Sequence, residues 1–210
     1  MLIRSLCRGF LAPVILVGFY TLPTTGKSLA AEPEEVALDQ QVLFDFDTKG
    51  DAQKWDSVND NVMGGRSEGA FRVTPKGILE FSGNLSLENR GGFASVRTKP
   101  DKLDLSKTDA LVIRVRGDGR SYYFNLYVPT NLIAFSYRAK FDTEAERWQE
   151  IRLPLKAFEA TWFGRTMSQA QPIDAENIRA LGFMISDKKA GPFKLEVDWI
   201  GAAGNTSPEP

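Results

Sequence analysis

The sequence predicts an all-β fold, a two-sheet antiparallel β-sandwich of the jelly-roll type. Apolar residues recur with a period of two along most of the chain, and helical periodicity is scarce. About ten such segments are separated by clusters of Gly, Pro, Asn and Asp at intervals typical of sandwiches. The chain shows no repeat and no low-complexity tract, so a single domain is expected.

The clearest alternation predicts three strands, over residues 111–116, 122–128 and 133–141. In each of them, one set of alternate side chains is apolar and the other is more polar, which indicates one buried and one wetter sheet face. Short helices are expected after Asp174, which can cap residues 175–178, and near 155–158. Shorter strands are expected over 42–47, 70–73, 77–82, 93–98, 148–153, 181–185 and 193–200.

The first thirty residues have the pattern of a signal peptide. Arg4 and Arg8 form a short positive start, residues 9–22 are apolar and uncharged, and residues 28–30 suit a signal peptidase. The apolar run is shorter than the roughly twenty residues of a spanning helix, so no spanning helix is expected after signal removal. We therefore expect an exported protein, periplasmic or extracellular. An uncleaved signal that anchors the chain in a membrane and a mitochondrial location are the alternatives.

The expected organisation is a signal peptide over 1–30, a linker over 31–41, the β-sandwich domain over 42–202 and a disordered tail over 203–210. Removal of the signal takes three of the 26 basic residues and leaves 23 against 27 acidic ones. Because the basic residues are interleaved with acidic ones, nucleic acid is not expected as a partner.

The composition restricts the chemistry of the protein. The chain has no histidine, and its only cysteine, Cys7, lies within the expected signal. The remaining chain would lack a thiol nucleophile, an imidazole base and the usual ligands of zinc, copper or haem. No nucleophile elbow, P-loop or dinucleotide fingerprint is present. The sequence therefore favours binding over catalysis, and we expect no enzyme activity and no cofactor.

Carboxylates suggest at most a structural calcium ion. Asp45 and Asp47 lie on one face of an expected strand, and Asp187 and Asp198 are further oxygen donors. Their spacing does not match a dedicated calcium loop, so turns and surface charge are the default interpretation.

The segment VNDNVMGGRSEG, over residues 58–69 and just after Trp55, has two interpretations. It can be a closed loop that bonds its own backbone, with Met63 packed against the sandwich, and this interpretation is favoured. It can instead be a binding loop in which Gly64, Gly65 and Arg66 present amides and a guanidinium to a carboxylate, phosphate or sugar hydroxyl. The candidate binding residues are Asn59, Asp60, Asn61, Met63, Gly64, Gly65 and Arg66.

The wetter strand faces supply a second candidate site. If they share one sheet face, the polar alternate residues combine aromatic surface with hydrogen-bond donors, which suits sugar rings or a protein partner. An ordinary solvated face is the alternative and is favoured, because the strand registers are unknown and a slip by one residue would reverse the faces. Trp162 lies in an expected loop and is the best exposed tryptophan candidate. The face would contain Arg114, Arg116, Tyr123, Asn125, Tyr127, Ser136 and Arg138.

Four segments in order resemble the complex I intermediate-associated protein 30 family. They are Trp55 with VNDNVMGGRSEG, then FSGNLSLENRGGFASVRT over 81–98, RWQEIRLPLKAF over 147–158 and ALGFMISDKKAGPFKLEVDWI over 180–200. The resemblance runs from about residue 43 to residue 200 and implies a galactose-binding-like β-sandwich. The family's mitochondrial members are assembly factors, non-catalytic proteins that hold intermediates of the respiratory NADH:ubiquinone oxidoreductase.

The resemblance implies that this chain is a protein-binding scaffold or chaperone-like factor whose partner is a protein, for instance in a membrane-associated complex. A secreted carbohydrate-binding module is the alternative function. A carboxylate-based glycosidase or lyase is the second alternative, although no pair of carboxylates stands out in the sequence.

Overall fold

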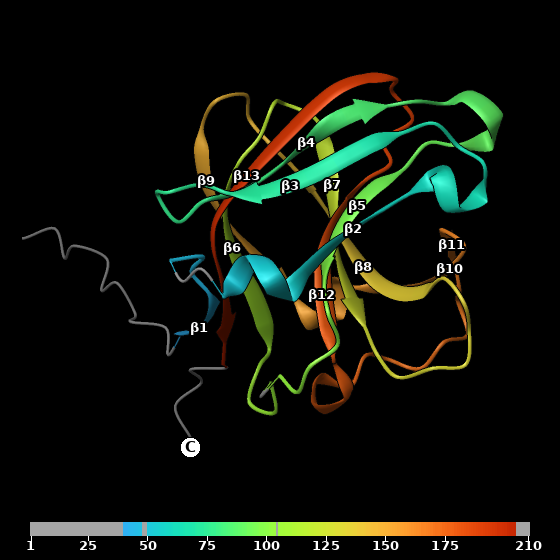
Figure 1. Ribbon diagram of the computed structural model, residues 1–210. Coiled ribbons are helices and arrows are strands. Elements are labelled where there is room, and N and C mark those ends of the chain that lie inside the picture. Colours follow the sequence, from blue (N-terminus) through green and yellow to red (C-terminus); the bar gives the residue numbers. More distant parts are fainter. Residues whose placement is uncertain (1–39, 48–49, 104, 205–210) are drawn as a thin grey trace, which may run out of the picture. The chain divides into compact units, whose positions relative to one another are not determined.

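A computed structural model describes residues 40–47, 50–103 and 105–204 (Figure 1). The expected signal peptide lies outside the described residues, as do residues 31–39 of the expected linker and residues 205–210 of the expected tail.

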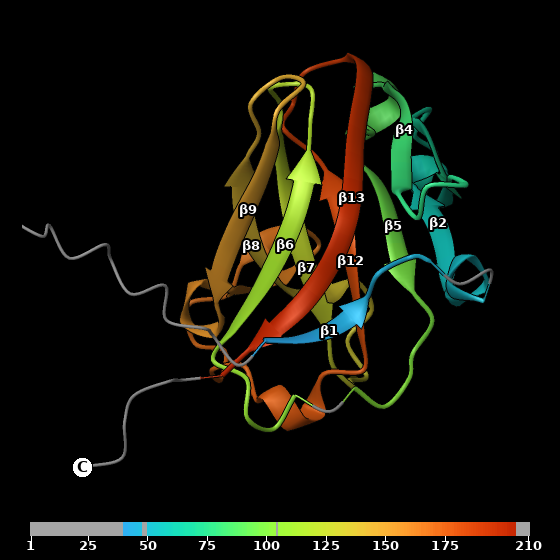
Figure 2. The same cartoon turned by 90° about the vertical axis from the view of Figure 1, so that its left-hand side faces the viewer.

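The described chain forms two antiparallel sheets, called sheet A and sheet B below. Figure 2 shows strands of sheet A in front and strands of sheet B behind them. Sheet A has the order β3 (Glu68–Val73), β4 (Leu79–Leu85), β13 (Gly191–Ala203), β6 (Ala110–Arg116) and β9 (Trp148–Pro154), and β1 (Gln40–Phe44) also pairs with β13. Sheet B has the order β11 (Arg165–Thr166), β10 (Glu159–Trp162), β8 (Phe135–Asp142), β7 (Ser121–Tyr127), β12 (Ala180–Ile185), β5 (Ala94–Thr98) and β2 (Trp55–Asn59).

The predicted fold class, a two-sheet antiparallel sandwich, is confirmed. Each of the ten expected strands corresponds to an observed one with shifted ends. β1 begins at Gln40, inside the segment expected to be linker, and β13 continues to Ala203. The sequence did not predict β2, β10 and β11, because these short strands carry polar residues and flank turns.

Strand β8 begins two residues later than expected. Leu132 and Ile133 lie in the preceding loop because Ala134 has a φ of 59°, which is incompatible with an extended strand. The helical segments are all short 3-10 turns: η1 (Asp51–Lys54), η2 (Asp60–Met63), η3 (Glu88–Arg90), η4 (Leu155–Ala157) and η5 (Ala175–Asn177). As predicted, Asp174 caps η5, where its carboxylate accepts from the Glu176 amide at 3.0 Å.

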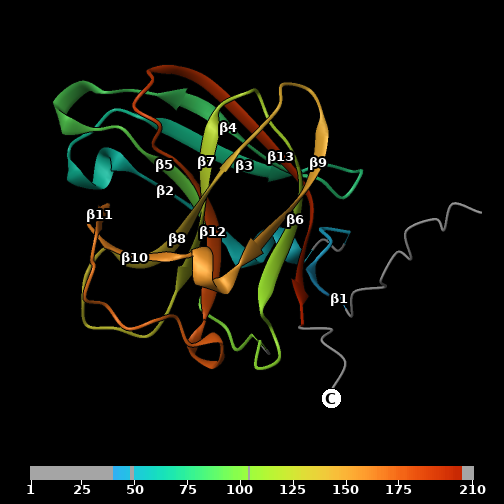
Figure 3. The same ribbon diagram turned by 180° about the vertical axis from the view of Figure 1, so that it is seen from behind.

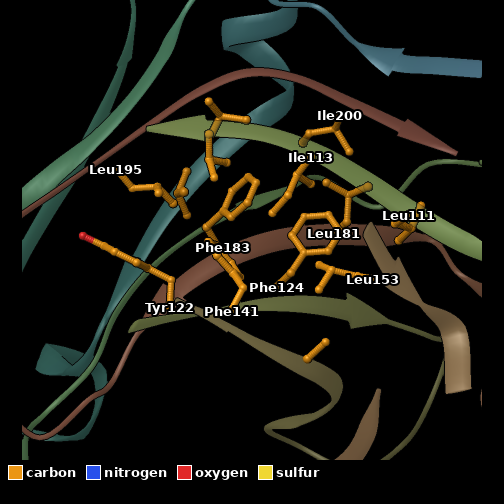
Figure 4. Packing of buried hydrophobic residues seen from close by; sticks show 14 of the residues in the cluster. Leu111, Ile113, Tyr122, Phe124, Phe141, Leu153, Leu181, Phe183, Leu195 and Ile200 are labelled. Carbon is orange, nitrogen blue, oxygen red and sulfur yellow. The ribbon is translucent and has the colours of Figure 1, made fainter. Parts of the chain in front are cut away.

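The core lies between the inner faces of the two sheets (Figure 4). Leu111, Ile113 and Leu195 come from sheet A, while Phe124 and Phe183 come from sheet B with their ring centroids 4.9 Å apart. Because strand side chains alternate between faces, burial of one set directs the other set outward. The core therefore decides which residues of each sheet are available to a ligand.

Candidate functional site

The two outer faces of the sandwich divide the predicted polar site. Arg114 and Arg116 lie on β6 of sheet A, whereas Tyr123, Asn125 and Tyr127 lie on β7 of sheet B. Residues directed outward from opposite layers of a sandwich point away from one another. The prediction that these five residues share one face is therefore wrong, because alternation assigns a face within a strand but does not assign the strand to a sheet.

The outer face of sheet A is already compensated in charge. Arg114 pairs with Asp198 at 3.0 Å, and Arg116 pairs with Glu196 at 2.5 Å. The hydrogen bond from Arg116 lowers the pKa of the Glu196 carboxyl below its ordinary value, against the opposing effect of burial. The Arg116 guanidinium also lies 5.0 Å from the ring centroid of Trp148. These arginines have their charge partners within the sheet.

The outer face of sheet B carries a row of residues that crosses six neighbouring strands, called the central row below. Each member is the cross-strand partner of the next, so the row is set by the register of the sheet. In order from β2 to β10, the central row consists of Asp56, Arg97, Gly182, Asn125, Arg138 and Glu159.

The two arginines of the central row stack on tyrosines instead of pairing with carboxylates. The Arg97 guanidinium lies 5.0 Å from the ring centroid of Tyr127, and that of Arg138 lies 4.5 Å from the ring centroid of Tyr123. Arg138 also donates to the carbonyl of Gly164 at 2.8 Å. Among the side chains that the structure describes, no carboxylate forms an ion pair with either guanidinium. Both guanidinium groups are therefore held against aromatic rings and form no ion pair with a described side chain, although a carboxylate is the cross-strand partner of each arginine, Asp56 of Arg97 and Glu159 of Arg138.

Asn125 lies between the two stacked pairs and is only 1% exposed. Its amide nitrogen donates to the hydroxyl of Tyr127 at 3.2 Å, but its Oδ1 has no hydrogen-bond partner in the protein. The Nε of Arg97 is likewise buried without a partner. Buried polar atoms are nearly always paired, so two orphans in one row mark it as unusual.

Gly182 separates Arg97 from Asn125 in the central row, and its lack of a side chain shapes the site. A Cβ at this position would overlap with the carbonyl oxygen of Val96 and lie 2.8 Å from the Cα of Arg97. The missing side chain also leaves room for Arg97 to extend across β12 toward Tyr127 on β7.

The loop over 58–69 is organised around the carboxylate of Asp60. This buried group accepts from the Ser67 amide at 2.8 Å, the Ser67 hydroxyl at 2.6 Å and the amides of Gly92 and Phe93 at 2.6 and 3.3 Å. Burial alone would raise the pKa of Asp60, but these hydrogen bonds outweigh it and lower the pKa below the ordinary value. Asp60 thus ties its own loop to a second pair of glycines, Gly91 and Gly92, just before β5.

The geometry of this loop favours the closed-loop interpretation. The amides expected to face a ligand are used internally, since Gly64 donates to the Asn61 carbonyl at 3.1 Å and Gly65 to the Asp60 carbonyl at 2.9 Å. A Cβ on Gly65 would overlap with the Asp60 carboxylate, so only glycine allows the backbone to lie this close to the carboxylate.

The other candidate residues of the loop have local roles or point outward. Arg66 pairs with Glu88 at 3.1 Å on the surface, and the Asn59 amide donates to the Gly69 carbonyl at 2.9 Å. Asn61 is exposed. The expectation that Met63 packs against the sandwich is wrong: the η2 turn directs it outward, and it is 59% exposed.

Trp162 is 47% exposed, in agreement with its predicted position, although it ends strand β10 instead of lying in a loop. Its indole nitrogen donates to the carbonyl of Ile133 at 3.0 Å. The sequence missed Arg97 and Gly182 as site residues. The alternation within FASVRT could have placed Arg97 on an outer face, but nothing local indicated that β5 lies in the same sheet as β7.

The remaining candidates do not form a further site. Asp187 is bound by Arg120 at 2.7 and 3.0 Å, and Asp198 is bound by Arg114, so neither is a free calcium ligand. Within the described ranges, no three carboxylate, His or Cys side chains gather where they could hold a metal ion. Two shallow hollows, one lined by residues 84–88 and 190–191 and the other by Gln40, Val42, Asp45 and Trp199, lie away from the central row.

The class of fold is a two-sheet β-sandwich of the kind found in carbohydrate-binding modules. The family 11 carbohydrate-binding module of the cellulosomal cellulase Lic26A-Cel5E of Clostridium thermocellum superposes with a TM-score of 0.60 at 20% identity, over 80% of this chain and 96% of that one. A structure of the Clostridium thermocellum module with a β-1,3-1,4-mixed-linked tetrasaccharide gives a TM-score of 0.59 at 21% identity, over 80% and 97%. At these identities the likeness concerns the fold alone.

The chain belongs to the complex I intermediate-associated protein 30 family, whose sequence profile matches residues 44–197. The mouse mitochondrial complex I intermediate-associated protein 30 is 31% identical over 191 residues, which cover 80% of this chain and 58% of the mouse protein. The Drosophila melanogaster protein of the same name is 28% identical over 182 residues, which cover 76% and 62%. The chain thus spans about three fifths of the length of these relatives. Among the described residues, no helix is long and apolar enough to cross a membrane.

Proposed function

We propose that this protein is a non-catalytic scaffold or chaperone-like factor that binds a partner protein of a larger complex through the outer face of sheet B. Membership in a family of complex I assembly factor homologues supports the class of function. The observation that carries the choice of face is the pair of guanidinium groups of Arg97 and Arg138, which are held on tyrosine rings in the central row and form no ion pair within the described part of the chain.

The arrangement suits a protein partner for physical reasons. Arginine and tyrosine are enriched among the residues that dominate interface energetics, and stacking restrains their side chains before the partner arrives. A carboxylate or a backbone carbonyl of a partner could accept hydrogen bonds from the exposed edges of both guanidinium groups. On sheet A the corresponding guanidinium groups are already bound to carboxylates.

A non-catalytic role is supported by the chemistry of this face. Its central row holds two carboxylates, Asp56 and Glu159, which stand five strand spacings apart. At about 4.8 Å per strand this separation is about 24 Å. Glycosidases need their two carboxyl groups roughly 5–10 Å apart, so this pair does not suit the glycosidase or lyase alternative.

Capture of a partner from native membranes tests the proposal. Wild-type protein, the double variant Arg97→Gln/Arg138→Gln and the matched control Arg114→Gln would be used as bait, with near-UV circular dichroism to verify the fold. We expect one specific partner with wild type and Arg114→Gln, and at least about tenfold less with the double variant. Equal recovery by all three baits would reject sheet B as the binding face, and no specific partner with any bait would reject the function.

Carbohydrate binding is a second candidate, favoured by Tyr123 and Tyr127 on the outer face of a sandwich that resembles a carbohydrate-binding module. Tyrosine rings can stack on sugar rings while the neighbouring arginines and Asn125 supply polar contacts. Titration with a mixed-linked β-1,3-1,4-glucan oligosaccharide, using Tyr123→Ala and Trp162→Ala as comparisons, tests this candidate. If the protein does not bind the oligosaccharide at millimolar concentration, the carbohydrate-binding function is rejected.

We also propose that the protein is exported, although the curated relatives named above are mitochondrial. The positive start, the uncharged apolar run and the cleavage-like segment within residues 1–30 support export. Cell fractionation, combined with mass spectrometry of the mature chain, tests the export proposal. Export predicts a chain that begins near Ala31, whereas an intact N-terminus in a membrane fraction would instead indicate an anchored protein.

A further inference from the structure

The largest cluster of exposed apolar side chains lies on two neighbouring turns at one edge of sheet B. Eight large hydrophobic residues are exposed in the described part of the chain, and four of them belong to this cluster. They are Leu132 and Ile133 in the loop between β7 and β8, and Trp162 and Phe163 at the turn between β10 and β11. We call residues 132–134 and 162–164 the apolar tips. The β10–β11 turn lies on the side of the domain away from β1 (Figures 1 and 3).

The two tips are fastened to each other by hydrogen bonds. The indole nitrogen of Trp162 donates to the Ile133 carbonyl at 3.0 Å, and the amide of Phe163 donates to the Ala134 carbonyl at 3.2 Å. The rings of Trp162 and Phe163 meet edge to face, with centroids 5.4 Å apart. The tips therefore form one surface that is built from both loops.

The backbone at the tips is held in a costly conformation. Ala134 has a φ of 59° and Phe163 a φ of 46°, in the left-handed region that residues with a Cβ rarely adopt. Ile133 is 80% exposed and Phe163 is 51% exposed beside these positions. Such local strain is typical of functional segments, and here it accompanies exposed apolar side chains.

The segments that carry the tips are nearly free of charge. Residues 128–137 contain no charged residue, and residues 160–173 contain only Arg165, although 25% of the whole chain is charged. Glu159 is the acidic residue next to these segments, and it belongs to the central row, where it accepts from the Thr166 hydroxyl at 3.2 Å. The surface around the tips thus offers apolar groups and two cations, Arg165 and Arg138, against one acid, Glu159, so its charge balance favours an anionic surface.

From these observations we propose that the apolar tips insert into the interface of an anionic lipid membrane. Insertion of the tips into a bilayer would leave few polar groups without a hydrogen bond. The Trp162 indole N–H, the Phe163 amide and the Gly164 carbonyl already form hydrogen bonds within the protein. Tryptophan and phenylalanine favour the membrane interface, and Arg165 is placed to meet lipid phosphates. The inference is distinct from the partner-binding proposal, since the inserted side chains lie at the edge of the sheet, and the two share only Arg138, which donates to the Gly164 carbonyl.

Quenching of Trp162 by lipid tests this directly on the full chain. Vesicles of phosphatidylcholine, with and without an equal part of phosphatidylglycerol, would carry brominated acyl chains that quench tryptophans inside the bilayer. We expect quenching that requires phosphatidylglycerol and disappears in Trp162→Phe, because Trp55 is buried in the core and the half-buried Trp148 and Trp199 lie on sheet A, the other layer of the sandwich. Because an apolar run such as residues 9–22 would bind lipid wherever it is retained, sedimentation is only used to verify that the chain is on the vesicle.

Variants at the tips provide the controls. Ile133→Asp/Phe163→Asp should weaken the lipid-dependent quenching at least about tenfold, since an acidic residue at each tip opposes insertion. Asp tolerates the left-handed backbone at position 163, so the turn should persist. Val62→Asp is the matched control, because Val62 is 70% exposed on η2, near the opposite edge of sheet B. Lipid should quench Trp162 in this variant as strongly as in wild type.

Three results would overturn the inference. The first is an unquenched Trp162 in a chain that sediments with anionic vesicles. The second is a double variant that is quenched like wild type. The third is a Trp162 that remains accessible to aqueous acrylamide on vesicles and becomes shielded only when a captured protein is bound, which would assign the tips to a protein partner.

Discussion

Replacement of the Asp60 carboxylate should reveal how much of the fold depends on the loop over 58–69. In Asp60→Asn, the amide oxygen can keep three of the four donors, and the NH₂ group must face the amide of Ser67. Hydrogen bonds to a charged acceptor contribute about 1 kcal/mol more than neutral ones, and an orphaned buried N–H costs about 1–3 kcal/mol. Three weakened bonds and one orphan sum to about 4–6 kcal/mol, and non-additivity favours about 4 kcal/mol.

Urea unfolding at pH 7 measures this loss. With a slope of about 2 kcal/mol/M, the midpoint should fall by about 2 M. The control is Asp56→Asn on the neighbouring strand β2, where the carboxylate is exposed and the expected change lies within about 0.5 kcal/mol. A free energy of unfolding for Asp60→Asn within about 1 kcal/mol of wild type would refute the view that this carboxylate holds the loop over 58–69 against Gly92 and Phe93.

The pH dependence of stability provides a second readout of the same group. The pKa of Asp60 in the folded protein lies below its ordinary value of 3.8, so the charged form stabilises the fold above that value. This contribution is lost as the pH falls from about 4 through the folded pKa. The difference in stability between wild type and Asp60→Asn should therefore shrink below about pH 4. A difference that stays constant down to pH 2 would show that the charge is not responsible.

Three further predictions concern stability. Gly65→Ala should cost about 3 kcal/mol in urea unfolding, because its Cβ would overlap with the Asp60 carboxylate; a neutral effect would mean that the loop can move aside. Arg120→Lys should cost about 3 kcal/mol, because lysine cannot make the paired hydrogen bonds to Asp187, and the depressed pKa of Asp187 should rise toward its ordinary value in an NMR titration. Asn125→Leu should leave the melting temperature unchanged or higher, since it removes an orphaned buried oxygen; a loss above about 2 kcal/mol would contradict this.

The strands and their faces could be predicted from the sequence because they follow from local alternation. The pattern around Tyr123, Asn125 and Tyr127 correctly indicates that all three side chains share one face of β7. The assignment of β6 and β7 to different sheets could not be predicted, because it depends on the path of residues 117–120 between them. The same limitation separated Arg97 from Tyr127, which are 30 positions apart in the chain and stacked in space.

The role of the loop over 58–69 was only half visible for a related reason. Its turn-forming residues are a local signal, and they indicated a closed loop. The partners of Asp60 lie 7, 32 and 33 positions away, at Ser67, Gly92 and Phe93. Long-range contacts of this kind leave no periodic trace in the sequence, so the carboxylate looked like one polar loop residue among several.

All six residues of the central row lie within the span that matches the family profile, residues 44–197. The two guanidinium groups of the row differ in how they are held. Arg138 donates to the carbonyl of Gly164 at 2.8 Å, whereas the Nε of Arg97 has no hydrogen-bond partner among the described residues. A guanidinium that makes fewer hydrogen bonds within the protein gains more from the acceptors of a partner, so Arg97→Gln should weaken capture more than Arg138→Gln, by about tenfold, or about 1.4 kcal/mol. The two variants are well matched, because each removes one guanidinium from one tyrosine ring. Capture efficiency measured side by side tests this order, and an equal or larger loss with Arg138→Gln would contradict it.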